Sequence, residues 1–266
     1  PESVIQGAIF ALKNKMLENA DLYIVGENKY KDSFSDFDNV YFIDAEDTVS
    51  FDTKPSQVLK LKTSSIYVGC EKLKTKELDA FVSAGNTGAL LAAGTFVAGR
   101  IKGIKRPALA VAVPSKTGNP RILMDLGANA EVKAEHFYDF AREGLAYAEF
   151  LGINNPRIGI LNIGTEDEKG TPLVKEASEL LKSKEDLNYI GFIESRELFE
   201  DRFDIILTDG FTGNMVLKSV EGTASFILNH IKDSVKNGGI LTKLGGLLLK
   251  NSLYSLKSKI DYRQYG

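Results

Sequence analysis

The hydrophobic positions of this chain follow two alternating patterns. Short continuous apolar runs have the length of buried strands and occur at 22–25, 40–43, 80–82, 107–113, 121–124, 157–162, 187–192 and 203–207. Between them, apolar residues recur every three or four positions, which predicts helices at 3–17, 64–74, from 89 onward, and at 131–151, 173–181 and 215–231. Strands that alternate with helices are typical of an α/β protein with a mostly parallel sheet.

The segment 79–100 has the pattern of a strand, a glycine turn and a helix. Its apolar run at 80–82 breaks at residues 83–88 and resumes as a helical pattern of small residues. In such a turn, Gly85 and Gly88 allow close backbone approach, while Ser83, Asn86 and Thr87 add hydrogen-bonding side chains. Either this turn binds an anion or its polar residues merely cap the helix.

The same arrangement recurs three more times along the chain. The later runs end in loops that contain, in turn, Asp125, Gly127 and Asn129; Asn162, Gly164, Thr165, Glu166 and Lys169; and Thr208, Asp209, Gly210, Thr212, Gly213 and Asn214. Because the carboxyl ends of parallel strands meet at one edge of a sheet, all four loops are expected to line that edge. We expect the functional site there.

Composition narrows the class of protein. The 266 residues are 43% hydrophobic and 26% charged, with a net charge of −3, which describes a globular protein with no overall attraction to nucleic acid. A single cysteine, Cys70, excludes an internal disulfide and fits a reducing, cytoplasmic compartment. No signal peptide and no apolar run near ~18 residues is found. Because the chain starts at Pro1 with a helix and stops at Gly266, we expect that residues are missing at both ends.

Two basic segments stand out against this composition. The first contains Arg100, Lys102, Lys105 and Arg106 and is either a solvated connector or a docking surface. In the second, within 234–262, Lys243, Lys250 and Lys257 share one helical face beside an apolar stripe of Leu249, Leu253, Leu256 and Ile260. A basic amphipathic segment of this kind lies on an anionic bilayer, docks an acidic partner or packs a dimer interface.

The candidate chemistry is non-covalent. No nucleophile and base pair is evident, and neither the two histidines, His136 and His230, nor the loop carboxylates have the spacing of metal ligands, so no metal and no cofactor are predicted. What remains is a set of glycine N–H groups, Asn and Thr donors and Lys169, which suits phosphate and a developing oxyanion. Lys169 is equally compatible with a surface lysine.

Five motifs together resemble the bacterial phosphate acyltransferase (PlsX) family over the whole chain. They are Ser83-Ala-Gly-Asn-Thr-Gly-Ala89, the segment 99–109, Asp125-Leu-Gly-Ala-Asn129, the segment 161–170 and Asp209-Gly-Phe-Thr-Gly-Asn214, in the family's order and spacing. The resemblance implies one domain over 1–266 with a three-layer α/β/α, isocitrate/isopropylmalate dehydrogenase-like fold and a helical excursion near the C-terminus. It also implies a homodimer.

The resemblance further implies attack of inorganic phosphate on the thioester of a fatty acyl-acyl carrier protein, which gives acyl phosphate for phospholipid synthesis. Lys169 and Asn214 match the family's active-site positions, and Asn86, Asn129 and their adjacent glycines match its phosphate-side loops. The expected phosphate-binding set is Ser83, Gly85, Asn86, Thr87, Gly88, Asp125, Gly127, Asn129, Asn162, Gly164, Glu166, Asp209, Gly210 and Gly213. Carrier-protein or membrane contact is expected from Arg100, Lys102, Lys105, Arg106, Lys243, Lys250, Leu253 and Lys257, and the enzyme would be cytoplasmic and peripherally bound to an anionic membrane.

Three alternatives stay open on the sequence. A phosphotransacylase that uses coenzyme A thioesters shares the fold class, but would not need the basic amphipathic segment. A nucleotide-dependent dehydrogenase would need a Gly-x-Gly-x-x-Gly turn before a helix, which is absent. A non-catalytic module could use the same loops to bind a phosphoryl ligand.

Overall fold

The structure is a computed structural model that describes the backbone of residues 2–17 and 19–260, and their side chains up to residue 250. It divides into two compact units, residues 1–102 and 103–266, and each is described by itself. The expectation of one domain over 1–266 stays a prediction.

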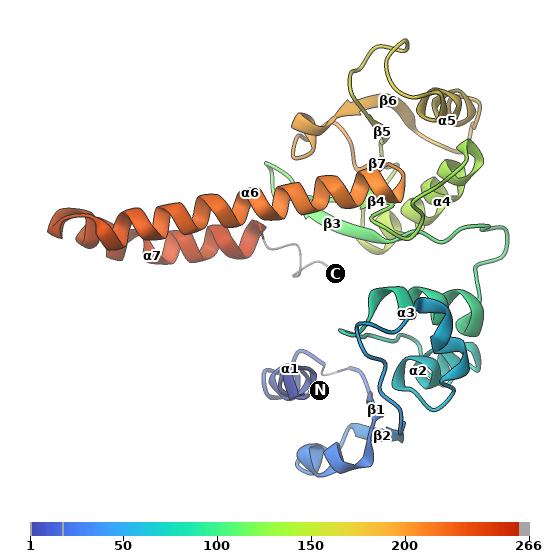
Figure 1. The fold of residues 1–266 in the computed structure, drawn as a ribbon, viewed down its shortest axis with the longest axis vertical. Helices are drawn as coiled ribbons and strands as arrows, with labels where there is room; N and C mark the ends of the chain where they lie inside the picture. Colours follow the sequence, from blue (N-terminus) through green and yellow to red (C-terminus); the bar gives the residue numbers. More distant parts are fainter. Residues whose placement is uncertain (1, 18, 261–266) are drawn as a thin grey trace. The chain divides into compact units, whose positions relative to one another are not determined.

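The first unit is built on a small parallel sheet of β1 (Leu22–Gly26) and β2 (Val40–Asp44), paired in register from Leu22 with Val40 to Gly26 with Asp44 (Figure 1). Its helical elements are α1 (Glu2–Lys13), η1 (Asn28–Phe34), η2 (Pro55–Lys60), α2 (Ser65–Lys74), α3 (Thr87–Ala93) and η3 (Gly94–Ala98). Cys70 is buried in the core that η2, α2, α3 and η3 form, and burial raises the pKa of its thiol.

The strand predicted at 80–82 is wrong. Residues 79–86 have no regular secondary structure, and Val82 is 92% exposed. Only Phe81 of this run packs inward, against α2 at Gly69, where an added Cβ would lie 2.3 Å from the Phe81 ring. Phe81 alone anchors this run to the core, and no described strand lies beside it. Without a partner for its backbone hydrogen bonds, the run does not form a strand.

The second unit contains a five-stranded sheet in the order β3-β4-β7-β5-β6. Its strands are β3 (Ala110–Pro114), β4 (Pro120–Met124), β5 (Ile158–Asn162), β6 (Tyr189–Glu194) and β7 (Ile205–Leu207). Only β3 is antiparallel, because it forms a hairpin with β4; the other three pairings are parallel. The residues Met124 and Ile160 both pair with Leu207, so the carboxyl ends of β4, β7 and β5 are level.

Helices cover both faces of this sheet. On one face, α4 (Ala134–Phe150) and α5 (Pro172–Lys182) bury a core that includes Phe137, Phe140 and Leu181. On the other face, α6 (Gly210–Asn237) packs with Val216, Leu217 and Val220 over a second core, beside the short η4 (Ser195–Glu197). The predicted three-layer α/β/α class is therefore confirmed.

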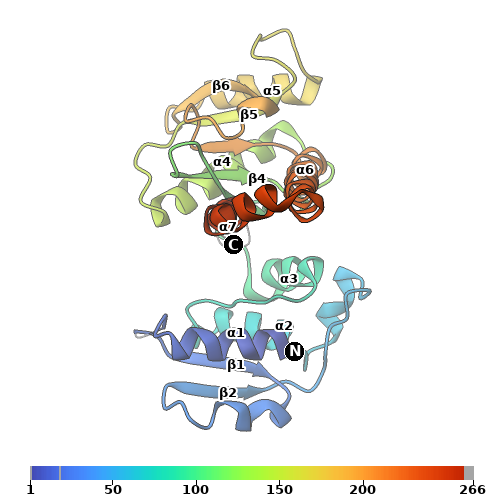
Figure 2. The same cartoon turned by 90° about the vertical axis from the view of Figure 1, so that its left-hand side faces the viewer.

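A helical hairpin extends from this unit. The helix α6 continues past the sheet and turns into α7 (Ile240–Ile260), which runs back beside it (Figure 1 and Figure 2). A Cβ added at Gly246 of α7 would lie 2.2 Å from Val235 Cγ1, so the glycine sets the closeness of the two helices. None of the described helices is long and apolar enough to cross a membrane.

An ion-pair network lies at the edge of the sheet where β4 and β7 begin. The guanidinium of Arg121 is buried and pairs with Asp201 and Asp204, and Asp204 also binds Arg157 through bonds of 2.8 and 2.9 Å. Burial raises the pKa of Asp204, but the bonds and charge of Arg157 outweigh burial and hold that pKa below its usual value. This network ties β4 to the start of β7.

Candidate functional site

The candidate site lies at the carboxyl edge of β4, β7 and β5. Because these strands are neighbours with level ends, the loops that follow them stand side by side. Three of the four predicted loops therefore share one edge, and they belong wholly to the second unit.

The loop after β4 is organised by Asp125, which is fully buried. Its Oδ1 accepts hydrogen bonds from the backbone N–H groups of Leu109 at 3.0 Å, Gly127 at 3.2 Å and Ala128 at 3.0 Å. Its Oδ2 accepts from the backbone N–H of Asn129 at 2.7 Å and from its side-chain Nδ2 at 2.9 Å. With both oxygens occupied by donors of the protein, this carboxylate shapes the loop.

The segment after β7 begins α6 earlier than predicted. The sequence pattern placed residues 210–214 in a loop, whereas α6 starts at Gly210, because Asp209 caps it by accepting from the Thr212 backbone N–H at 2.8 Å. The Gly210 N–H donates to Asn129 O at 2.9 Å. At Gly213 an added Cβ would lie 2.0 Å from Asp125 O, so only glycine lets the helix touch the neighbouring loop.

Asn214 lies in this first part of α6 with its side chain exposed. A Cβ built at Gly127 would lie 3.8 Å from Asn214 Cγ, so the amide stands directly beside the loop that follows β4. Gly127 has φ +125°, a backbone conformation that favours glycine. The Asn214 amide thus lies in the first turns of α6, beside the loop that follows β4.

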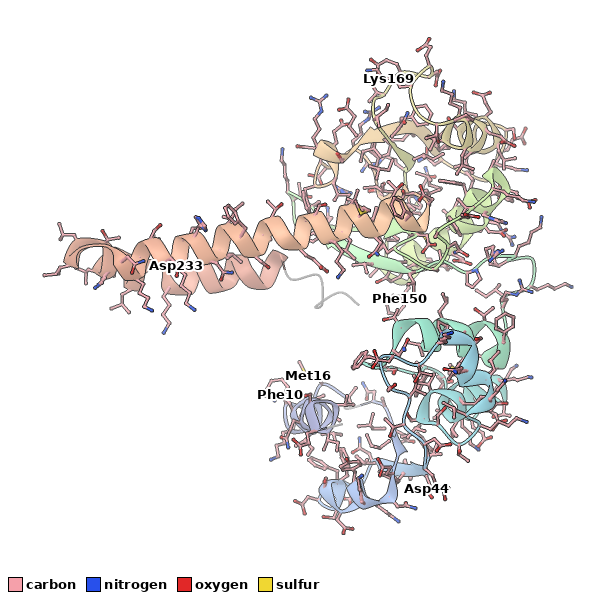
Figure 3. All side chains as sticks on the ribbon, viewed as in Figure 1. Phe10, Met16, Asp44, Phe150, Lys169 and Asp233 are labelled. Atoms are coloured by element: carbon pink, nitrogen blue, oxygen red, sulfur yellow. The ribbon has the colours of Figure 1, made fainter. Side chains whose placement is uncertain are left out.

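The loop after β5 carries Lys169. Asn162 Nδ2 donates to Lys169 O at 3.1 Å and closes the loop, while Lys169 Nζ pairs with Glu166 Oε1 at 2.7 Å. This hydrogen bond raises the pKa of Lys169 and lowers that of Glu166, so both stay charged. A Cβ at the buried Gly164 would lie 2.4 Å from Lys169 Cδ, so both charged side chains fold over the glycine. Figure 3 shows Lys169 at the outer end of this loop.

The loop at 83–88 belongs to the first unit and does not follow a strand, which corrects the prediction that all four loops share one sheet edge. Asn86 is the N-cap of α3: its Oδ1 accepts from Ala89 N at 3.0 Å, and its Nδ2 donates to the carbonyls of Ser50, Phe51 and Thr53. The Ser83 hydroxyl accepts from Gly85 N at 3.2 Å. Asn86 is therefore a helix cap that also fastens the segment 50–53. A Cβ at Gly88 would lie 2.8 Å from Pro55 Cγ, while Thr87 is exposed.

A carboxylate that the sequence analysis did not identify lies behind the site. Glu143 on α4 accepts from the backbone N–H of Ala108 at 2.9 Å, and Asp139 accepts from the backbone N–H of Lys105 at 2.8 Å. Burial raises the pKa of Glu143 to about 7, against the bond from Ala108 and with the help of the nearby Asp139 and Asp125 charges. The only signal in the sequence was a glutamate among the buried-face positions of a helix.

The residues of the two predicted basic segments lie in different parts of the structure. Arg100 and Lys102 are exposed in the first unit, whereas Lys105 and Arg106 are exposed in the second, where Lys105 Nζ binds Glu135 at 2.7 Å. Lys243 and Lys250 are exposed on α7. The predicted contacts at Leu253 and Lys257 lie outside the described side chains. Among the described residues, no group of three His, Cys, Asp or Glu side chains could hold a metal ion.

Solved structures of transacylases share this architecture. A phosphotransacetylase from Streptococcus pyogenes is 15% identical with a TM-score of 0.57, and the match covers 82% of this chain and 87% of that one. The EutD phosphotransacetylase from Staphylococcus aureus is 16% identical with a TM-score of 0.54, over 79% of this chain and 77% of that one. The chain thus shares its α/β fold with these two phosphotransacetylases.

Sequence similarity defines the family of the chain more closely than the fold does. A family model described as "Fatty acid synthesis protein" matches residues 1–266. A phosphate acyltransferase from Petrotoga mobilis is 63% identical over 266 residues, all of this chain and 82% of the relative. One from Streptococcus agalactiae is 44% identical over 269 residues, which cover 81% of that relative. The chain belongs to this family of acyltransferases, which confirms the resemblance drawn from the five motifs.

Proposed function

We propose that this protein transfers a fatty acyl group from acyl-acyl carrier protein to inorganic phosphate and thereby supplies acyl phosphate for phospholipid synthesis. The observation that carries the proposal is the placement of Lys169 and Asn214 in the segments that follow the adjacent strands β5 and β7, in a chain 63% identical to a phosphate acyltransferase.

The chemistry needs no nucleophile from the protein. A phosphate oxygen attacks the thioester carbonyl carbon, the carbon–sulfur bond breaks, and the carrier thiolate leaves and takes up a proton. Phosphate brings negative charge to the site, and negative charge develops on the thioester oxygen during attack, so positioned donors lower the barrier most. The site offers such donors in an ammonium and a carboxamide.

In this proposal Lys169 binds phosphate. Its present partner is Glu166, at 2.7 Å, with both side chains about half exposed. An exposed ion pair of this kind contributes little to stability, so phosphate can displace the carboxylate. Asn214 Nδ2 would donate to the thioester oxyanion, held in place by its contact with the Gly127 loop.

Several other predicted site residues of the second unit would act by shaping these loops. The side chains of Asp125, Asn129 and Asp209 form hydrogen bonds with backbone groups of the protein itself. Gly164, Gly210 and Gly213 allow contacts that a Cβ would block. They would fix where Lys169 and Asn214 stand.

Acyl carrier protein, anionic membrane and a second copy of the chain are the proposed partners. The exposed Lys243 and Lys250 on α7 stand among apolar side chains with large exposed fractions, such as Leu241 at 83% and Leu248 at 78%. A helix of this composition binds an anionic bilayer at its surface. We expect salt-sensitive binding to anionic vesicles that weakens when Lys243, Lys250 and Lys257 are replaced by glutamate. Vesicle sedimentation unchanged by this replacement would refute the membrane contact.

The basic residues 100–106 are proposed to steer the acidic carrier protein, which predicts an on-rate that falls with salt. Neutralising Arg100, Lys102, Lys105 and Arg106 should slow association without changing its final geometry. An on-rate with the same value and salt dependence as the original would contradict this role.

The decisive experiment is phosphate-dependent release of carrier thiol from palmitoyl-acyl carrier protein, with palmitoyl-coenzyme A run beside it. Release from the carrier-protein thioester alone supports the proposal, and equal release from coenzyme A favours the phosphotransacylase alternative. Lys169→Ala should lower kcat/KM by at least ~10-fold, while Lys182→Ala, an exposed lysine that pairs with Asp167 in the same loop, serves as the matched control. Phosphate binding without release from either thioester would identify a non-catalytic binding module.

A further inference from the structure

The outer face of α6 carries apolar side chains that no described part of the unit covers. Phe211 is 63% exposed, Met215 57% and Phe226 61%. At 100° per residue, these three positions and Gly222 fall within about 60° of one another around the helix. We call Phe211, Met215, Gly222 and Phe226 the α6 stripe.

The contacts of α6 with the sheet and with α7 lie on the other side of the helix. Val216, Leu217 and Val220 pack on the sheet, and Val235 packs against Gly246 of α7. A Cβ added at Gly222 would find nothing within 4 Å, so the middle of the stripe is open. Lys218 lies on the same face, but its Nζ is held 2.8 Å from Glu221 Oε2, which draws the charge to one side.

The stripe begins at the candidate site. Phe211 is the second residue of α6, directly after Asp209 and Gly210, and three residues before Asn214. Ile163, which is 79% exposed, directly follows β5, the neighbour of β7 in the sheet. The exposed apolar surface is therefore continuous in position with the loops proposed to hold the reacting groups.

The stripe is long enough to take one class of ligand. Helical rise places Phe226 about 22 Å from Phe211 along the axis. A fatty acyl chain spans about 15 Å, half the hydrocarbon thickness of a bilayer. An extended acyl chain whose carbonyl carbon lies at Asn214 would thus pass the level of Gly222, about 12 Å along the axis, and end about 3 Å before the backbone of Phe226. Side chains on a helix lean toward its N-terminus, so the Phe226 ring covers the level at which the chain ends.

We propose that the α6 stripe binds the acyl chain of the substrate and sets the preference for chain length. Phe211 and Met215 contact the first methylenes, and the missing side chain at Gly222 leaves room for the chain. Phe226, whose ring is tilted against that of His230 with centroids 4.3 Å apart, contacts the distal end of the chain. This inference rests on the proposed function, because it takes the acyl thioester as substrate.

The test compares chain lengths. For Phe226→Ala, the ratio of kcat/KM for palmitoyl- over octanoyl-acyl carrier protein should fall about fivefold, since only the long chain loses contacts. Phe211→Ala should lower kcat/KM for both lengths. Ile227→Ala is the matched control, because Ile227 is 50% exposed on the same helix but points away from the stripe, and its ratio should stay within about twofold of the original.

A palmitoyl-acyl carrier protein with a photoreactive group near the chain end gives a readout that does not depend on turnover. Cross-links at residues 222–226 are expected. Turnover with cross-links elsewhere, or equal ratios for Phe226→Ala and Ile227→Ala, would overturn the inference and leave the proposed function intact. Cross-links at 222–226 without any phosphate-dependent release would instead overturn the proposed function and support the stripe. A Phe226→Ala protein that loses self-association while keeping the original ratio would assign the stripe to a second copy of the chain and overturn the inference.

Discussion

Glu143→Gln should make the protein more stable at neutral and alkaline pH. Burial raises the pKa of Glu143 to about 7 in the folded chain, whereas an unfolded glutamate titrates near its ordinary value of 4.5. Between these two values the folded state binds more protons than the unfolded state, so this group lowers stability as the pH rises. Glutamine stays neutral throughout, and its side-chain oxygen can still accept the hydrogen bond from Ala108 N.

The expected gain in stability follows from the size of the pKa shift of Glu143. Each unit of pKa difference corresponds to ~1.4 kcal/mol, so a fully buried carboxyl with this shift would lower the free energy of unfolding by about 3 kcal/mol once it is ionised. Glu143 is only half-buried, and solvent screens part of this cost, so we expect Glu143→Gln to be more stable than the original by ~1–2 kcal/mol at about pH 8. At about pH 4, below both pKa values, the two proteins should differ by less than ~0.5 kcal/mol, because the glutamate is then protonated in both the folded and the unfolded chain.

The measurement is urea unfolding of both proteins across this pH range, with equal m-values as the check that the same surface unfolds. Glu149→Gln, at an exposed position on the same helix, controls for the removal of one negative charge. If the stability difference between Glu143→Gln and the original protein is constant with pH, the carboxyl does not titrate in this window and the reasoning fails.

Further predictions concern the contacts that build the site, and urea unfolding checks each of them. Gly213→Ala should destabilise by ~1–3 kcal/mol, because the new Cβ would meet Asp125 O, whereas Gly222→Ala, in open space on the same helix, should stabilise by ~0.5–1 kcal/mol; equal effects would contradict the contact. Asp125→Asn should cost ~2–4 kcal/mol, because its amide would face N–H donors, while Asp209→Asn should cost less than ~1 kcal/mol, since asparagine also caps helices well; the reverse order would refute these roles. Asp204→Ala should cost ~2–3 kcal/mol by leaving the buried Arg121 with one carboxylate fewer, and a loss below ~1 kcal/mol would show that the network contributes little.

The sequence predicted the elements with strong periodicity well. The helix expected at 64–74 is α2, with Ser64 as its cap, and the strands expected after residues 120, 157 and 203 became β4, β5 and β7 of one sheet. These segments succeed because their apolar spacing reflects burial against a neighbouring layer. Periodicity says nothing about partners, so the run at 80–82 was assigned to a strand although no strand pairs with it.

The candidate site was predicted in position more than in detail. Glycine and capping residues at 209–214 indicated a loop from the sequence, yet they form the start of α6, because an N-cap aspartate followed by small residues supports a helix as readily as a turn. Glu143 could not be identified, since its raised pKa arises from burial beneath a segment more than thirty residues away along the chain, with Ala108 as its donor.

The hydrogen bonds suggest a division of roles among the polar residues in the predicted loops, in which many of them would shape the loops rather than touch a ligand. Asp125, Asn86 and Asp209 each use their side-chain oxygens to hold backbone N–H groups of their own unit. Lys169 and Asn214 differ, because their polar ends are exposed. A substitution at Asp125 should therefore disturb stability and activity together, whereas Lys169→Ala should disturb activity alone. This separation distinguishes residues that build the phosphate site from residues that would touch phosphate.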